Sequence, residues 1–265
     1  MSYRDKLSII FIATISAALV IAFMLFISFE NSYGYKKGIY IRKQIGQEII
    51  ADGGSIELTF YSTRNEKYDF LYFQAALVND DIKTVCDSKV TINDRNDIYQ
   101  EIILDLYPKN IIDDTIYTSL YLIDDDKTIV IDIGNIRAMY IKQEISKDVS
   151  LLCSIDVNEV ECMIDVTNNT ESKIQIDKIL FAGKEYLIND GIEKECYKRF
   201  NYLLEGLNGN NDELLINPLI VYRINNNISY AYSNEDICSN ELKEEKQVLK
   251  FLRTQEKVSL NYIKS

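Results

Sequence analysis

Alternation of apolar and polar positions predicts that most of the chain folds as short β-strands. In one stretch Ile56, Leu58 and Phe60 alternate with Glu57 and Thr59, as expected for a strand with one buried face. Turn-forming clusters separate such stretches by about 8–12 residues, a spacing typical of β-sandwiches and barrels. Further strand candidates with these features are residues 70–78, 98–106, 117–123, 128–133 and 136–142.

A second strand-rich region is predicted to begin near residues 146–148. Its first hairpin is expected to turn at Val157-Asn158, which places Cys153 opposite Cys162 and all the alternating apolar residues on one face. In this register the two Cα atoms would lie about 4.5 Å apart, within the range of about 4.4–6.8 Å that a disulfide spans. We therefore expect a Cys153–Cys162 disulfide, with two free core thiols as the alternative. The alternating residues are Leu151, Cys153, Ile155, Val160, Cys162, Ile164 and Val166.

One helix is predicted to interrupt these strands near residues 191–205. Asp190-Gly191-Ile192-Glu193 resembles a capping box, and Gly206 is a natural helix terminator. A second helix is expected over Glu241–Glu256. The apolar residues behind these two predictions are Ile192, Cys196, Phe200 and Leu204, and then Leu242, Leu249 and Leu252.

The N-terminal region differs from the rest because residues 7–29 contain no charged side chain. A helix of this length would be about 34 Å long, enough to cross a hydrocarbon core of roughly 30 Å. The run ends in Ser28-Phe29-Glu30-Asn31, without the small-residue cleavage site of a secretory signal peptide. We therefore predict a retained transmembrane helix; a cleaved signal and a buried core helix are the alternatives.

These patterns divide the chain into three parts. Residues 1–35 are predicted to form the membrane helix and its flanks, residues 36–145 a first domain, and residues 146–265 a second domain. The predicted fold class is therefore mainly β, with a transmembrane helix followed by two β-sandwich, immunoglobulin-like domains. One or two short helices are expected in the second domain.

Composition narrows the chemistry that the chain is able to perform. Its 265 residues carry 41 acidic and 29 basic side chains, for a formal charge of −12, and include no histidine. Without histidine, Ser-His-Asp catalysis and imidazole metal ligation are excluded, and the acidic balance disfavours nucleic acid as a partner. No Gly-rich phosphate loop, nucleophile elbow or Cys-x-x-Cys motif occurs. We predict no catalytic residue, cofactor site or metal site, and no enzymatic activity.

Clusters of acidic residues are compatible with metal binding or with carboxylate-based hydrolysis. Asp124-Asp125-Asp126 and the oxygen-rich residues 208–213 are candidates for Ca²⁺ binding, but neither has the complete ligand pattern of a calcium loop. A pair of carboxylates could also serve glycoside hydrolysis. Solvated turns explain the same clusters. The alternative function is therefore a ligand-binding or metal-binding ectodomain, or a carboxylate-based hydrolase.

Cysteines and glycosylation motifs bear on the compartment. Basic residues that follow the apolar run favour a cytoplasmic body, whereas a disulfide favours an oxidising exterior, and we give the disulfide more weight. Cys196 and Cys238 form a second candidate pair, which leaves Cys86 unpaired. Asn168-Asn169-Thr170 and Asn227-Ile228-Ser229 match the N-glycosylation motif, so Asn168 and Asn227 are candidate glycosylation sites in predicted loops.

The N-terminus has a short basic tail followed by Leu7-Ser8 and a hydrophobic run. In this it resembles archaeal type IV pilin-like proteins, and the resemblance implies a hydrophobic helix followed by a β-sandwich. The segment from Ile164 through Asn169 to Ile176 is likewise similar to archaeal surface sandwich modules. Lys6 stands where the peptidase of that family would want Gly or Ala before its cleavage point.

Together these observations predict a single-pass, membrane-anchored protein of the cell surface with its main body outside the cell. Its expected role is structural or protein-binding, as a filament subunit or as a component of an envelope complex. The expected partners are the lipid bilayer, through residues 7–29, and other envelope or surface proteins or a second copy of the chain.

Overall fold

The structure is a computed structural model that is mainly β, with 64% of residues in strands and with curled sheets. Two compact units are present, one comprising residues 1–37 and 242–255 and the other residues 38–241 and 256–265. The residues described are 14–16, 18–24, 37–51, 53–63, 66–80, 82–94, 97–110, 114–125, 127–141, 148–156, 161–203, 213–232, 238–239, 242, 244–258 and 262–264.

The transmembrane helix predicted for residues 7–29 was wrong. The helix in this segment is short and covers residues 14–24, which at 1.5 Å per residue is about 17 Å, well below the roughly 30 Å of a hydrocarbon core. Within the described part of the chain, no helix is both long and apolar enough to span a membrane. Residues 7–13, 17 and 25–29 of the predicted span lie outside the described residues.

The C-terminal helix α2 (Glu245–Thr254) lies within the predicted range 241–256. It begins with a capping box in which the backbone N–H of Glu244 donates to the Gln247 side chain at 2.9 Å. Val248, Phe251 and Leu252 are its buried residues. Their spacing of three and four positions forms one apolar stripe, as in an amphipathic helix.

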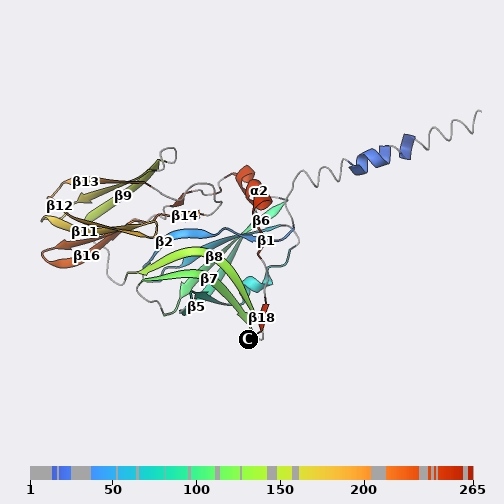
Figure 1. Cartoon of the computed structure of the whole chain (residues 1–265), viewed down its shortest axis with the longest axis horizontal. Helices are drawn as coiled ribbons and strands as arrows, with labels where there is room; N and C mark the ends of the chain where they lie inside the picture. The colour runs from blue at the N-terminus through green and yellow to red at the C-terminus, as the bar shows by residue number, and fades with distance from the viewer. Residues whose placement is uncertain are drawn as a thin grey trace, which may run out of the picture. The chain divides into compact units, whose positions relative to one another are not determined.

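Eleven strands of the described chain form one curled sheet (Figure 1). Its order is β1-β3-β6-β5-β4-β7-β8-β2-β14-β17, and β18 pairs with the start of β8. A short 3-10 helix, η1 (Asp69–Tyr72), precedes β4. The strands are β1 (Ile39–Ile41), β2 (Gln44–Ile50), β3 (Ile56–Thr63), β4 (Gln74–Val78), β5 (Lys83–Asp94), β6 (Tyr99–Pro108), β7 (Asp114–Asp124), β8 (Lys127–Tyr140), β14 (Glu213–Leu215), β17 (Cys238–Ser239) and β18 (Tyr262–Lys264).

The alternation that predicted these strands also selects the buried face. Ile56, Leu58 and Phe60 of β3 are fully buried in one apolar cluster with residues of β4, β6, β7 and β8. Glu57, between them, is exposed. The curled sheet therefore packs its own apolar side chains together on one face, as period-two patterning requires.

Three late segments return to this sheet although the sequence places them in the second predicted region. β14, β17 and β18 join it after the chain has left residues 39–140. β14 runs parallel to β2, where Arg42 and Gln44 each donate a hydrogen bond of 3.0 Å to the buried carboxylate of Glu213. This carboxylate is buried together with its charged partner, which is the arrangement that a buried charge needs.

Two glycines allow the parallel strands to approach each other. Gly46 has φ +133°, and a Cβ there would lie 2.1 Å from the carbonyl oxygen of Leu215. Gly134 has φ +99°, and its Cβ would lie 2.1 Å from the carbonyl oxygen of Gln44. Both contacts are with backbone, which cannot move aside as a flexible side chain can. Any larger residue would therefore separate β2 from its neighbours.

Residues 149–203 and 219–232 form two smaller sheets that share one core (Figure 1). The three-stranded sheet has the order β13-β10-β9, and the four-stranded sheet has the order β12-β11-β15-β16. Cys162, Ile164 and Val166 of the first sheet are buried with Ile176 and Tyr222 of the second. The strands are β9 (Val149–Asp156), β10 (Glu161–Asn168), β11 (Ile174–Phe181), β12 (Lys184–Ile192), β13 (Tyr197–Leu203), β15 (Leu219–Ile224) and β16 (Asn227–Tyr232).

The helix predicted for residues 191–205 was wrong, because this segment ends β12 and forms β13. A spacing of four is an even number, so it fits the alternation of a strand as well as a helical turn. The predicted capping residue Asp190 instead accepts hydrogen bonds from the Gly191 backbone and the Lys198 side chain. Pairing of β13 with β10 along its whole length overrides the local helical signal.

Gly46→Ala tests the close approach of β2 and β14. We expect Gly53→Ala to lower the free energy of unfolding by about 1 kcal/mol, because Gly53 has φ +78° but open space around it. Gly46→Ala should cost about 2 kcal/mol more, because the backbone clash is added to the strain. Urea unfolding followed by far-UV circular dichroism measures both; equal losses would contradict the clash.

Candidate interaction surface

The outer face of the three-stranded sheet carries the candidate site. Alternation along β9, β10 and β13 sends one set of side chains into the shared core and the other set outward. The strand register arranges the outward residues in rows across the sheet. The rows are Tyr197–Thr167–Ser150, Arg199–Asp165–Leu152, Asn201–Met163–Ser154 and, on β13 and β10 alone, Leu203–Glu161.

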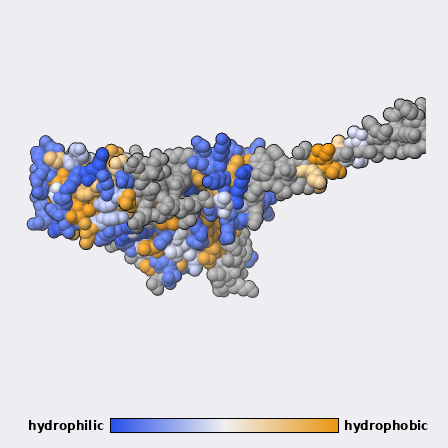
Figure 2. All heavy atoms as spheres, turned by 45° about the horizontal axis from the view of Figure 1, so that its top comes forward, coloured by the Kyte–Doolittle hydropathy of each residue, from blue (hydrophilic) through white to orange (hydrophobic). Residues whose placement is uncertain are grey.

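Three large apolar side chains on this face are open to solvent. The exposed fractions are 70% for Tyr197, 67% for Leu152 and 65% for Leu203. Such residues are common singly on surfaces, and these three stand in three different rows of the face with polar residues between them. Figure 2 shows apolar and polar side chains interspersed at the surface of the part of the chain that contains β9–β16.

The outer face of the four-stranded sheet is different because the large sheet covers part of it. Its outward residues Leu180, Leu219 and Val221 are buried in a cluster with Ile141 and with Met139 of β8. Gln47 of β2 fixes this junction, since its side-chain amide donates to the carbonyl oxygens of Leu180 at 3.1 Å and Asn217 at 2.5 Å. Leu180, Leu219 and Val221 of the four-stranded sheet thus have a described cover, whereas Leu187 of the same sheet and the three large apolar residues of the three-stranded face do not.

An ion pair occupies the second row of the candidate face. Arg199 donates from Nε to Oδ1 of Asp165 and from Nη2 to Oδ2, both at 2.7 Å. These hydrogen bonds hold the pKa of Asp165 below its ordinary value and raise the pKa of Arg199. The pair therefore persists as the pH falls toward the ordinary pKa of an aspartate. Because it is exposed it adds little stability, but the paired hydrogen bonds hold the guanidinium in one orientation across β10 and β13.

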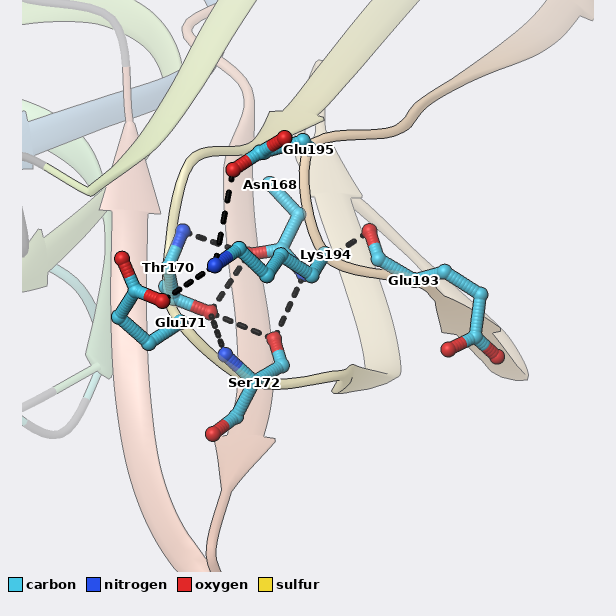
Figure 3. A network of polar contacts seen from close by, with 7 residues as sticks. All are labelled: Asn168, Thr170, Glu171, Ser172, Glu193, Lys194 and Glu195. Carbon is cyan, nitrogen blue, oxygen red and sulfur yellow. Dashed lines mark hydrogen bonds and ion pairs between the residues drawn. The ribbon is translucent and has the colours of Figure 1, made fainter.

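A buried asparagine sets where β13 begins (Figure 3). The side-chain amide of Asn168 donates to the carbonyl oxygens of Ser172, Ile192 and Glu193 at 2.9–3.1 Å. Its side-chain oxygen accepts from the backbone N–H and the hydroxyl of Thr170. One side chain thus ties the end of β10 to the turns on both sides of it.

The backbone of Asn168 completes this connection. Its N–H donates to the carbonyl oxygen of Cys196, and its carbonyl oxygen accepts from the backbone N–H of Glu195, both at 2.9 Å. Lys194 forms ion pairs with Glu171 and Glu195 on the outside of the same turn (Figure 3). Tyr197 consequently starts β13 directly opposite Thr167.

Cys153 and Cys162 lie on the inner side of this sheet, but not directly opposite each other as predicted. The ladder pairs Cys153 with Ile164 and Cys162 with Ile155, two residues away from the predicted register. A shift of two keeps every side chain on its face, so the prediction of the shared apolar face is confirmed for the described residues, and Val160 and the predicted turn at Val157-Asn158 lie outside them. The two Sγ atoms lie 3.4 Å apart as a diagonal pair. The hydrogen bond between them lowers the pKa of Cys162 and raises that of Cys153.

An aromatic cluster beside this pair was not predicted. The rings of Phe181, Tyr186 and Tyr202 lie 4.5–4.8 Å apart between centroids. The buried hydroxyl of Tyr202 has no hydrogen-bond partner among the described residues. Burial of the hydroxyl is the main reason that the pKa of Tyr202 is raised to about 12, and charge repulsion from Tyr186 and Cys162 adds to it. The only sequence feature that could have indicated this cluster was the alternation of Phe200 and Tyr202 with polar residues, and we had interpreted that segment as a helix.

The remaining predicted site residues are dispersed. Cys196 is exposed in the turn before β13, Cys86 is buried in the large sheet, and the backbone of Cys238 lies in β17. Their predicted pairing stays a prediction. Asn168 is fully buried with its amide hydrogen-bonded, so the folded chain offers no accessible amide there for a glycan. Asn227 is exposed at the start of β16.

The acidic clusters do not converge within the described residues. No group of three or more acidic or cysteine side chains there is placed to hold a metal ion. A hollow of about 270 Å³ lies at the four-stranded sheet, and the residues that line it include Lys173 and Arg223 and no carboxylate. Both cations already pair with acids, Lys173 with Glu193 and Arg223 with Asp177. This hollow does not have the donors of a cation site.

Comparison with known proteins does not assign the chain to a family. No protein-family model matches the chain, and no curated protein matches it.

Tyr202→Phe tests the unpartnered hydroxyl inside the three-stranded sheet. We expect the variant to be as stable as the parent or more stable by up to about 1 kcal/mol, because it removes a buried polar group that forms no hydrogen bond. Tyr117→Phe is the matched control, since the buried Tyr117 hydroxyl lies 2.7 Å from the Thr84 hydroxyl. The control should lose about 1–3 kcal/mol in urea unfolding. Equal losses in the two variants would show that Tyr202 has a partner.

Proposed function

We propose that the protein is a non-enzymatic binding module whose outer three-stranded sheet face contacts another protein. The supporting observation is the exposure of Tyr197, Leu152 and Leu203 on the same sheet face as the Arg199–Asp165 pair. Tyrosine, methionine and arginine are enriched in protein interfaces, and Met163 lies in the row beside this pair. A structural role, in a filament or an envelope complex, is one form of this proposal.

The face has the physical features that a binding surface needs. Its backbone is fixed by pairing of β10 on both sides, and its start is fixed by Asn168, so little ordering would be required on binding. The exposed apolar side chains offer area for burial. Arg199 and Asp165 offer oriented hydrogen-bonding groups at a site that is already charge-neutral, which favours a partner without strong net charge at this point.

We further propose that residues 149–203 and 219–232 form an immunoglobulin-like β-sandwich. Support comes from their three plus four described strands and the core shared by the two sheets. An immunoglobulin constant-type domain also divides about seven strands between two packed sheets. Such sandwiches occur widely as modules of cell-surface proteins, which fits a binding role better than a catalytic one.

Serine substitutions on the two small sheets test the binding face. The triple variant Leu152→Ser/Tyr197→Ser/Leu203→Ser should lose proteins that the parent chain captures from an extract of its own organism. Leu187→Ser is the matched control, because Leu187 of β12 is 74% exposed but lies on the other sheet. Quantitative mass spectrometry of the captured proteins should show at least a tenfold loss for the triple variant alone. Equal capture by the parent and the triple variant would refute the face as the binding site.

We also propose that the module works in an oxidising compartment outside the cell. The 3.4 Å separation of the Cys153 and Cys162 sulfur atoms supports this, because a small movement would bring them to bonding distance, and disulfides persist outside the cytosol. Protein isolated with immediate thiol alkylation and mapped without reduction should contain the Cys153–Cys162 link. Cys86 should be alkylated after unfolding, as the internal control. Alkylation of both Cys153 and Cys162 as free thiols would contradict the proposed compartment.

A further inference from the structure

The free edge of β9 differs from the opposite edge of the same sheet. Among the described strands β9 pairs with β10 only, and its residues 149–155 contain no charged residue and no proline. Exposed edge strands usually carry charges, prolines or bulges that prevent pairing with another chain. β13, at the other edge, has Lys198 and Arg199 in the strand. β9 has none of these protections over seven residues.

Apolar side chains of β9 remain partly in water on both sides of the sheet. Leu151, Cys153 and Ile155 face the core but are only half-buried, whereas their counterparts on β10 are fully buried. Leu152, on the outer side, is 67% exposed. A further strand alongside β9 would cover both sets while satisfying the backbone groups at the edge.

We propose that β9 pairs antiparallel with β9 of a second copy of this chain. The strand is complementary to itself about a two-fold axis at Leu152. This axis places Leu152 opposite Leu152 of the second copy and keeps the outer faces of both sheets on the same side, as an isologous interface requires. The other pairs are Val149 with Ile155, Ser150 with Ser154, and Leu151 with Cys153.

Neighbouring registers are less favourable. Moving the axis by one residue along the strand, to Leu151 or Cys153, shifts the pairing by two positions and retains the faces. Leu152 would then lie opposite Ser150 or Ser154, and an apolar side chain would be paired with a hydroxyl on the outer face. Only the axis at Leu152 matches apolar with apolar and hydroxyl with hydroxyl over the whole segment.

Charge sets the ends of the paired segment. Asp148 precedes it and Asp156 follows it, and the two-fold axis brings each aspartate position near the other one in the second copy. These like charges oppose pairing beyond Val149–Ile155, and the chain's formal charge of −12 adds a general repulsion. Salt screens such repulsion between exposed charges. Self-association should therefore be stronger at 0.5 M than at 0.05 M sodium chloride.

Pairing through β9 goes beyond the proposed binding face, because it uses the edge of the sheet rather than its surface. The product is a six-stranded sheet with Leu152 of both copies at its centre. It also presents two Arg199–Asp165 pairs and two copies of Tyr197 and Leu203 on one side. A dimer of this kind would offer any partner of the outer face two adjacent sites, which increases avidity.

Sedimentation velocity of the full-length chain over a concentration series tests the dimer. Ser154→Glu adds a negative charge at the free edge, near the position of Asp148 of the second copy, and should weaken self-association at least tenfold. Asn201→Glu is the matched control with the same net charge, because Asn201 and Ser154 are exposed in the same row on opposite edge strands. The control should dimerise as the parent does. A monomeric parent at all concentrations and at both salt levels, or equal weakening by both glutamates, would overturn the proposal.

Cysteine cross-linking tests the register itself. Leu152→Cys lies on the two-fold axis and should form a covalent dimer under mild oxidation, identified by peptide mapping as a link between two copies of residue 152. Ser154→Cys faces Ser150 of the second copy and should not link to itself, while Ser150→Cys/Ser154→Cys should link residues 150 and 154. The unsubstituted chain controls for the native cysteines. Equal linking at Leu152→Cys and Ser154→Cys would overturn the register.

Discussion

Burial of one apolar face of the three-stranded sheet is the constraint on which the proposed binding role depends. Cys162, Ile164 and Val166 of β10 pack in a core with the four-stranded sheet, and alternation then places Met163, Asp165 and Thr167 on the outside. The inward residues hold the sheet, so the outward ones are available for binding. The same constraint makes β9 an edge, because three strands provide two edges and only the central strand is paired on both sides.

Asymmetry between the two small sheets determines which surface is open. Both sheets carry apolar residues on their outer sides, but Leu180, Leu219 and Val221 pack with residues that include Met139 of the large sheet. Hydrogen bonds also fix the geometry of this junction, because the side-chain amide of Gln47 donates to the backbone carbonyl oxygens of Leu180 and Asn217. This cover includes Leu180, Leu219 and Val221 but not Leu187 of β12, whereas Leu152, Tyr197 and Leu203 of the three-stranded sheet have no described cover at all. Alternating apolar patterns in the sequence thus lead to a packed junction in one case and to a candidate interface in the other.

Local alternation was the reliable signal in the sequence, and long-range pairing was the missing one. Period-two patterning predicted β3 and the buried face of β9 and β10. It could not distinguish the predicted register of β9 on β10 from the observed one, which differs by two residues, because both registers bury the same side chains. It also could not separate β13 from a helix, since a spacing of four fits both. β14 and β17 are too short to show any period, and β14 is held by the approach of Gly46 and by the buried Glu213. The candidate face could not be predicted because exposure of Leu152 and Tyr197 depends on which sheet another part of the chain covers.

Hydroxyl-radical footprinting tests the central claim, that the outer three-stranded face is occupied by a partner in the native setting. Tyr197 and Leu203 are the informative residues because they lie on the face and away from the β9 edge, and Leu187 is the reference on the other sheet. In the dilute purified chain all three should be oxidised readily. In the native extract, oxidation of Tyr197 and Leu203 should fall several-fold while that of Leu187 is unchanged. Equal oxidation of Tyr197, Leu203 and Leu187 under both conditions would contradict the account.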